Sequence, residues 1–271
     1  MPTSSPSPSP SPSPPSSAAP AQPAHIKVFW QPGCSSCLRT KEFLTKQGIA
    51  YESINVQDND AALAELLRLG ARGLPVVSLG DRFTLCQSFG DLLKFIDVKT
   101  RLSDALPPAE LVAKIDLVLT AAARYTRQFP EAQLKLQFRD RKRTQGATAF
   151  HVFRVVEMTL DAADGEGLHV EGFRDVPPAD WSGNDIADWG LQVRDRALAW
   201  WAAQTDRELA YSISTYYGDR PLHDVLDRTA WHAAQHTRQL MLMLESIGIA
   251  PDRPLTAEDL RGLPVPDEVW G

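Results

Sequence analysis

The sequence predicts a multidomain protein in which an α/β domain is followed by an all-α four-helix bundle. The chain has 271 residues, more than one average domain needs. Short apolar segments alternate with helical patterns over residues 25–98, whereas residues 108–250 hold four long helical patterns and no pattern typical of parallel strands. We expect a polar linker at 99–107 and a C-terminal extension at 251–271 that packs loosely.

The first 24 residues are mostly serine and proline. Such a tract cannot bury enough apolar surface to offset its ordering entropy, so we predict a disordered tail at 1–24. It has neither a basic start nor an apolar stretch, so we do not expect a signal peptide. A second interpretation, an extended proline-type ligand for a partner, stays open.

Residues 25–98 predict the order β-α-β-α-β-β-α, with one central sheet covered by helices. Glycine and proline positions separate the elements along this segment. The expected strands span 26–29, 51–56, 74–79 and 82–85, and the expected helices span 38–47, 61–69 and 89–96.

Composition excludes several classes of protein. A net charge of -6 argues against a nucleic-acid partner, which usually requires a basic excess. No run of about eighteen apolar residues is present, so we expect no membrane span. Three cysteines are too few for a secreted disulfide framework, so we expect a cytoplasmic protein in a reducing compartment.

Two of the cysteines, Cys34 and Cys37, form a Cys-x-x-Cys pair between the first strand and the first helix. The unpaired N–H groups and the dipole at a helix N-terminus favour an anion there, so more of the Cys34 thiol is expected as thiolate. Cys37 follows about one turn later and can close a disulfide by exchange. A zinc site is the alternative, for which only Cys86 and His25 are further ligands in this segment.

With its Pro-Gly-Cys-Ser-Ser-Cys turn, a proline at position 75 and the helix pattern Phe89-Gly90-Asp91-Leu92-Leu93, the segment 25–98 resembles a glutaredoxin of the thioredoxin-like fold. The resemblance implies a thiol–disulfide oxidoreductase with Cys34 as nucleophile and Cys37 as resolving thiol. It also implies a cis peptide bond before Pro75. The substrate-binding residues that it implies are Gln31, Leu74, Pro75, Ser88 and Phe89.

Two departures from the glutaredoxin pattern bear on the substrate. Gln31 stands near the place where glutaredoxins usually carry a lysine for a glutathione carboxylate, and Gln87-Ser88 stands where they usually carry two glycines. Glutathione, another small thiol and a protein disulfide therefore all remain as co-substrates. The remaining cysteine, Cys86, is expected to be a buried structural thiol rather than a regulatory one.

The second segment predicts four helices, at 109–129, 148–163, 186–205 and 221–247, joined by loops that should cap one end of the bundle. On the fourth helix, His232 and His236 lie about 40° apart around the axis, one turn above the other. His151 shares the apolar face of the second helix with Val155 and Met158. Three inward imidazoles with an open position are typical of a catalytic site for zinc or another first-row divalent metal. Hydrogen-bonded core histidines without a metal are the competing interpretation.

The motif Trp231-His232-Ala233-Ala234-Gln235-His236, together with Phe150-His151-Val152-Phe153, resembles the DinB-like metal-dependent bundle superfamily. The resemblance implies a divalent metal held by His151, His232 and His236. Members with assigned reactions often use small thiols, as thiol-dependent transferases or isomerases, which is consistent with a fused glutaredoxin-like domain.

One basic run, Arg139-Asp140-Arg141-Lys142-Arg143, is expected to be a solvated loop, with a role in receiving carboxylates as the alternative. Tyr216 and Tyr217 are expected in the core, with a pocket wall as the alternative.

Three functional hypotheses follow. The first is a thiol–disulfide oxidoreductase whose metal-binding bundle acts as a thiol-dependent transferase or isomerase. The second is a non-catalytic redox- or metal-responsive binding module, and the third makes the bundle a structural or dimerising appendage. The expected partners are small thiols or protein disulfides, without nucleic acid or membrane; a homodimer stays open.

Overall fold

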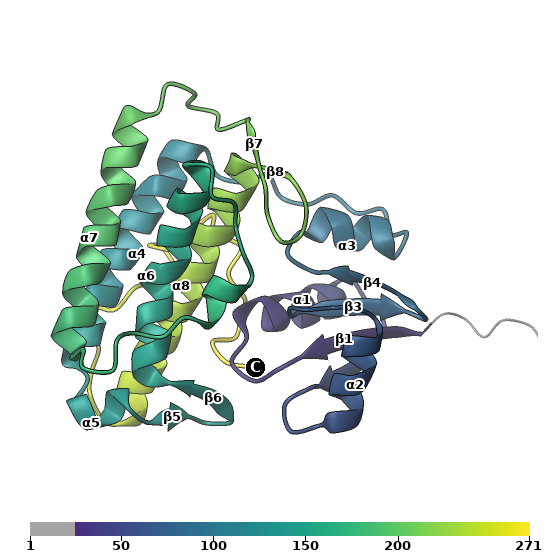
Figure 1. Ribbon diagram of the computed structural model, residues 1–271, viewed down its shortest axis with the longest axis horizontal. Helices are drawn as coiled ribbons and strands as arrows, with labels where there is room; N and C mark the ends of the chain where they lie inside the picture. Colours follow the sequence, from purple (N-terminus) through teal and green to yellow (C-terminus); the bar gives the residue numbers. More distant parts are fainter. Residues whose placement is uncertain (1–24) are drawn as a thin grey trace, which may run out of the picture.

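The computed structural model describes residues 25–271, in which an α/β domain lies beside a helical bundle (Figure 1). The predicted disorder of residues 1–24 lies outside this range. The α/β domain follows the predicted order of elements. Its strands are β1 (Ile26–Trp30), β2 (Glu52–Asn55), β3 (Val76–Leu79) and β4 (Arg82–Leu85), and its helices are α1 (Ser35–Lys46), α2 (Asp60–Arg68) and α3 (Phe89–Phe95).

The four strands form one sheet in the order β2-β1-β3-β4. Strand β1 runs parallel to β2 and antiparallel to β3, and β4 pairs antiparallel with β3. Side chains alternate between the faces, so Val28 and Val77 pack with residues of α1 and α3 while Phe29 and Val76 pack with Leu66 of α2. Helices therefore cover both faces of the sheet, as the sequence predicts.

Each helix of this domain begins at a polar or sulfur-bearing cap. Asn59 accepts from the backbone N–H of Ala62 at the start of α2, and Ser88 accepts from that of Asp91 at the start of α3. At α1 the cap is Cys34. Capping satisfies backbone donors that have no partner within the helix. Because Cys34 is the cap of α1, this helix begins at the next residue, Ser35.

The bundle is built from four long helices, of which α4 and α6 alternate with α7 and α8 around its axis. Helices α6 and α7 pack closely because α7 has a glycine at the contact. A Cβ added at Gly190 would lie 2.4 Å from the ring of Phe153 on α6. The four helices are α4 (Pro108–Gln128), α6 (Gln145–Ala163), α7 (Gly183–Ala203) and α8 (Leu222–Ser246).

Short elements that the sequence does not predict individually fill the connections between these helices. They are α5 (Glu131–Leu134), β5 (Gln137–Phe138), β6 (Arg141–Thr144), the 3-10 helix η1 (Glu171–Arg174), β7 (Ser212–Ile213) and β8 (Arg220–Pro221). Strands β5 and β6 pair with each other, and so do β7 and β8.

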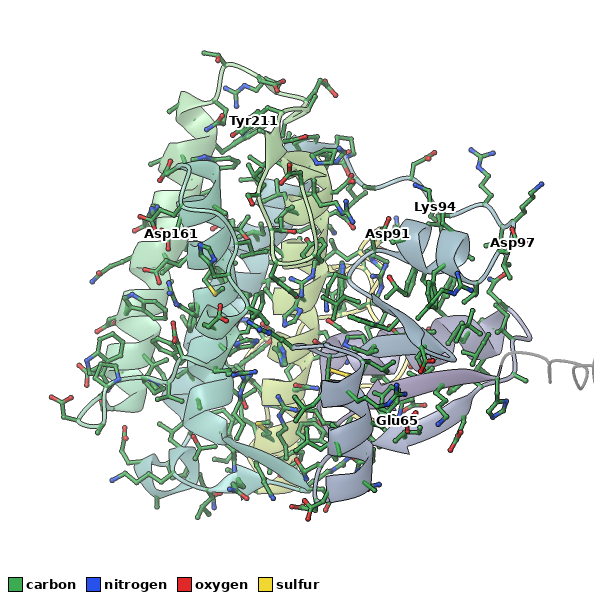
Figure 2. The ribbon with its side chains drawn as sticks, turned by 45° about the vertical axis from the view of Figure 1, so that its right-hand side comes forward. Glu65, Asp91, Lys94, Asp97, Asp161 and Tyr211 are labelled. Carbon is green, nitrogen blue, oxygen red and sulfur yellow. A yellow bond between two sulfur atoms is a disulfide. The ribbon has the colours of Figure 1, made fainter. Side chains whose placement is uncertain are left out.

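The two domains contact each other through α1, which packs against α8 (Figure 1). The guanidinium of Arg39 on α1 lies between two rings, 4.1 Å from the centroid of Phe89 and 4.5 Å from that of Trp231. Asp91 stands on the side of α3 that faces the bundle (Figure 2), where Arg220 of β8 pairs with it. A buried cation–π stack and an ion pair thus hold the domains together.

The expectation that residues 251–271 pack loosely is wrong. Leu260 and Leu263 are buried in the core of the bundle. Near its end the segment also reaches the α/β domain, where the N–H of Gly33 donates to the carbonyl of Gly271 over 2.8 Å and the Trp270 ring lies against Gly33. Apolar side chains between the prolines give this segment enough surface to bury, so it connects both domains.

Within the described range, no helix has the length and apolar character needed to cross a membrane.

Candidate functional site between the domains

The cysteine pair forms a disulfide at the N-terminus of α1. Cys34 has an extended backbone and caps the helix, and its sulfur accepts from the N–H of Cys37 over 3.2 Å. The same donor and the helix dipole would stabilise a Cys34 thiolate once the disulfide opens. Of the residues named for the alternative zinc site, the pair is joined as a disulfide and Cys86 is buried in an apolar cluster with Val28, Val77 and Leu92.

The two sulfurs differ in accessibility. Cys34 is half-buried and lines a cavity, whereas the Cys37 side chain is 1% exposed. An incoming sulfur can therefore reach Cys34 and not Cys37. This difference agrees with the predicted roles of nucleophile and resolving thiol.

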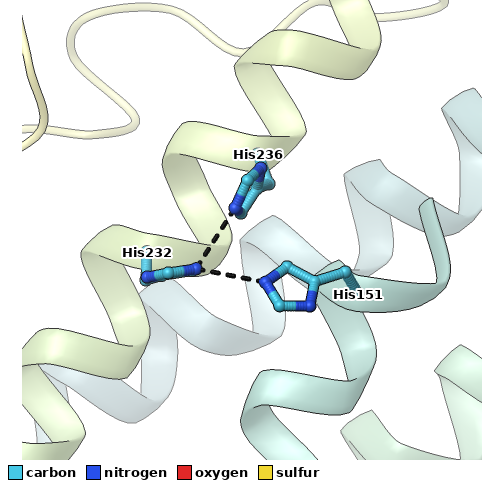
Figure 3. A group of neighbouring side chains, drawn as sticks. All are labelled: His151, His232 and His236. Carbon is cyan, nitrogen blue, oxygen red and sulfur yellow. Dashed lines mark hydrogen bonds between the residues drawn. The ribbon is translucent and has the colours of Figure 1, made fainter. Parts of the chain in front are cut away.

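The three predicted histidines lie together in the bundle, His151 from α6 and the other two from α8 (Figure 3). The Nε2 atoms of His151 and His232 are 3.3 Å apart, and those of His232 and His236 are 3.1 Å apart. All three rings are buried. Three imidazole nitrogens that converge at these distances form one face of a tetrahedral ligand set.

The chemistry of these rings fits a divalent metal. Burial, with the charge of Arg143 as a further cause, lowers the pKa of His236 to about 3, and burial lowers the pKa of His151 and His232 well below the usual value. All three are therefore neutral at pH 7, the state that binds metal. The Nδ1 of His236 lies 2.7 Å from Oε1 of Gln239, an acceptor that places its proton on Nδ1 and leaves Nε2 free for a metal.

The disulfide turn and the histidines are neighbours. Ser35, which directly follows Cys34, has its Oγ 3.4 Å from Nε2 of His236. Because α1 packs against α8, the N-terminus of one helix is held beside the histidines of the other. Ser35 and His236, which are 201 positions apart in the sequence, thereby belong to one site.

Both centres open onto a single cavity of about 770 Å³ between the domains. Its wall includes Cys34, His151, His232 and His236. The volume suits a small molecule of substrate size.

Two of the predicted substrate-binding residues, Gln31 and Leu74, also line this cavity. The peptide bond before Pro75 is cis, as expected, but Pro75 is not part of the wall. Ser88 caps α3 and Phe89 stacks on Phe43 at 4.0 Å, and neither reaches the cavity. Substrate binding by these five residues stays a prediction.

The predicted solvated loop at 139–143 is wrong in part, because Arg141, Lys142 and Arg143 belong to strand β6 and line the cavity. Arg141 donates to the carbonyl of Pro32 over 3.0 Å. With the Gln31 amide turned so that its oxygen faces Arg141, that oxygen also accepts from Arg141 Nη1 over 2.7 Å.

Sequence reasoning did not find Arg228, and it favoured the core for Tyr216, yet both line the cavity. Arg228 donates to Oε1 of Gln87 over 2.7 Å and to the Tyr216 hydroxyl over 3.2 Å. The available signal was the position of Arg228, one turn before His232 on the same helix.

Comparison with known proteins assigns a family to each part of the chain. Residues 26–84 match the Glutaredoxin family, and residues 114–240 match the DinB superfamily. A comparison with curated proteins found no match. Among solved structures, YfiT from Bacillus subtilis, described as a probable metal-dependent hydrolase with an unusual four-helix bundle topology, is similar with 12% identity and a TM-score of 0.42, over 56% of this chain and 96% of that one.

The two matches follow the order of the domains in the structure; the first ends before α3, and the second runs from within α4 to within α8. The chain thus combines an α/β domain that matches the Glutaredoxin family with a helical domain that matches the DinB superfamily and brings together three histidines of the kind that hold a metal ion.

Proposed function

We propose that this protein is a thiol–disulfide oxidoreductase that acts on a small thiol or disulfide held in the cavity between its domains. One observation carries the proposal: the accessible sulfur of Cys34 and the three buried histidines line the same cavity. A cavity of about 770 Å³ favours a small substrate over a protein disulfide.

The exchange takes two steps. The Cys34 thiolate attacks one sulfur of a disulfide R–S–S–R′, the S–S bond breaks, and R′S⁻ leaves and takes up a proton. Cys37, after losing its proton, attacks the Cys34 sulfur of the mixed disulfide and releases RS⁻. Two electrons pass from the dithiol to the substrate, and the Cys34–Cys37 disulfide seen in the structure is the product. Two equivalents of a small thiol restore the dithiol and are themselves oxidised to their disulfide.

The residues around Cys34 support these steps. The N–H of Cys37 donates to the Cys34 sulfur, so it stabilises negative charge there without further rearrangement. Cys37 is buried directly beneath and reaches Cys34 only from within the protein. A mixed disulfide on Cys34 thus projects into the cavity while its resolving thiol attacks from the opposite side.

His151, His232 and His236 would hold a divalent ion of the zinc type, whose positive charge would favour the thiolate form of a thiol in the cavity. The bundle would then work as a thiol-dependent transferase or isomerase that uses the same small thiol as the disulfide centre. The position of Ser35 supports the closeness of the two centres, because this residue directly follows Cys34 and its Oγ lies 3.4 Å from Nε2 of His236.

The test is a disulfide reductase assay with small disulfides on the wild-type protein and on Cys34→Ser and Cys37→Ser. Cys86→Ala is the matched control, since Cys86 is buried away from the cavity. We expect Cys34→Ser to fall to the uncatalysed rate and Cys86→Ala to keep its activity.

Retained activity in Cys34→Ser would overturn the proposed nucleophile. If the wild-type protein reduces no small disulfide, but its affinity for another protein changes with the redox state of the cysteine pair, the molecule is a redox-responsive binding module instead.

A further inference from the structure

The wall of the interdomain cavity carries an excess of positive charge. Five arginines line it, and Glu171 is the only acidic residue among the lining side chains. Arg72 and Arg174 are exposed. Arg141 and Arg143 are half-buried, and only 5% of the surface of Arg228 is exposed. The five arginines are Arg72, Arg141, Arg143, Arg174 and Arg228.

The deeper arginines contact only uncharged groups. Arg141 donates to the Pro32 carbonyl, Arg143 donates to the Phe173 carbonyl over 2.6 Å, and Arg228 donates to an amide oxygen and a phenol. No aspartate or glutamate within residues 25–271 forms an ion pair with any of these three, and residues 1–24 contain neither residue type.

Three arginines on the outer surface of the same bundle are paired differently. Arg154 contacts three carboxylates, and Arg194 and Arg196 contact two each. These three arginines are therefore neutralised by carboxylates. Arg141, Arg143 and Arg228 inside the cavity have no such counter-charge among the described residues.

Burial of an unpaired charge is costly, because the low dielectric disfavours the ion and no opposite charge compensates. Burial lowers the pKa of Arg141 and of Arg143 to about 10, so both guanidinium groups still carry their charge near neutral pH. An anion that enters the cavity would meet several guanidinium donors in a partly desolvated site, the setting in which charge-assisted hydrogen bonds are strongest.

We propose that Arg141, Arg143 and Arg228 form a carboxylate-binding site of the helical domain that faces Cys34, and that the substrate is a small thiol or disulfide carrying carboxylate groups. This inference rests on the proposed function and names its substrate class. The α/β domain supplies the reacting sulfur, and the helical domain supplies the charge that orients the substrate. Neither domain alone contains both parts of the site.

The experiment compares two disulfides of similar size, the anionic dithiodiglycolate and the uncharged bis(2-hydroxyethyl) disulfide. We expect Arg143→Gln to lower kcat/KM for dithiodiglycolate by at least about tenfold and to leave that for the uncharged disulfide within about twofold. Arg154→Gln, an arginine with carboxylate partners outside the cavity, is the control and should change neither value. Activity on the uncharged disulfide also reports that each variant is folded.

Equal losses on both disulfides, or no loss on either, would overturn the carboxylate site while leaving the oxidoreductase intact. If the wild-type protein reduces neither disulfide, the proposed function fails, and binding then tests the site separately. Calorimetry on the oxidised wild-type protein with S-methyl mercaptosuccinate, which has no thiol to react, should show binding that Arg143→Gln weakens at least about tenfold. The dimethyl ester of the same compound has no carboxylate charge. If the wild-type protein binds the ester as tightly as it binds S-methyl mercaptosuccinate, the inference is overturned.

Discussion

The two chemical centres of this protein are constructed in different ways. The disulfide lies within four consecutive residues and takes its environment from the helix that it caps. The histidine centre takes His151 from α6 and two histidines from α8, the nearer of which, His232, is 81 positions later in the sequence. This centre exists only because the two helices pack together. The first centre therefore depends on local backbone structure and the second on tertiary packing. Changes in the bundle should damage the histidine centre and leave the disulfide in place.

The largest expected effect is on metal content. His232→Ala removes the ligand whose Nε2 lies within 3.3 Å of both other histidines, so we expect bound divalent metal to fall from one per chain to background. Elemental analysis of the purified protein measures this. His169→Ala, at an exposed histidine outside the cluster, should keep its metal. The comparison also requires that His232→Ala still forms the Cys34–Cys37 disulfide, which leaves Cys86 as the one free thiol after oxidation. A count of three free thiols in the unfolded, oxidised variant would break the comparison.

A second expectation concerns the pH dependence of stability in the metal-free protein. The three histidines have lowered pKa values when folded, His236 about 3, whereas imidazoles in the unfolded chain titrate near ~6.5. Between these values the unfolded state binds more protons, so the free energy of unfolding should fall as the pH falls. The loss is up to about 1.4 kcal/mol per pH unit for each histidine that stays neutral.

Urea unfolding between about pH 6.5 and 4.5 measures this slope. Other groups also titrate in this range, so the matched comparison is with His236→Gln, which should show a smaller slope. Identical slopes for the two proteins would show that His236 is not held neutral by the fold.

A smaller effect is expected at the hydrogen-bond partner of a metal ligand. Gln239→Leu removes the acceptor of the His236 Nδ1 proton, so the ring loses the contact that fixes its orientation. Loss of such a partner typically weakens metal affinity by about 10–100-fold. Competition with a chelator measures the affinity, and a value within about twofold of wild type would assign Gln239 to packing alone.

The smallest effect is expected at a surface ion pair between the domains. Lys142 and Asp58 pair with side chains that are 61% and 64% exposed. Exposed pairs contribute about 0–1 kcal/mol, so Lys142→Ala should change the free energy of unfolding by no more than that. A loss well above this range would mean that the domain interface depends on charge more than on the packing of α1 against α8.

Most of the framework was predictable because it depends on short-range rules. Apolar periodicity predicted α4 at 109–129 and α8 at 221–247, where the structure has Pro108–Gln128 and Leu222–Ser246. The same periodicity placed the three histidines on inward faces. Helix starts were predicted less well: α1 begins at Ser35 rather than at 38, because Cys34 acts as the cap and the helix includes the second cysteine.

The cavity was not predictable, because it depends on how two domains meet. Composition predicted a solvated loop for the basic run, yet alternation along β6 turns Arg141 and Arg143 toward the same side. Arg228 is buried because it donates to Gln87 of the other domain and to the Tyr216 hydroxyl, two partners that only the folded molecule brings together. The docking of residues 251–271 likewise depends on surfaces that exist only after both domains have folded.

The most direct test asks whether the two centres share one cavity. In Cys37→Ser, a small fluorinated thiol such as trifluoroethanethiol can be held on Cys34 as a mixed disulfide, and the histidine site can be loaded with paramagnetic Co²⁺ or with diamagnetic Zn²⁺. A shared cavity predicts that Co²⁺ strongly broadens the fluorine resonance relative to Zn²⁺, and that His232→Ala removes the difference. Equal line widths with the two metals, at full metal loading, would contradict a common site.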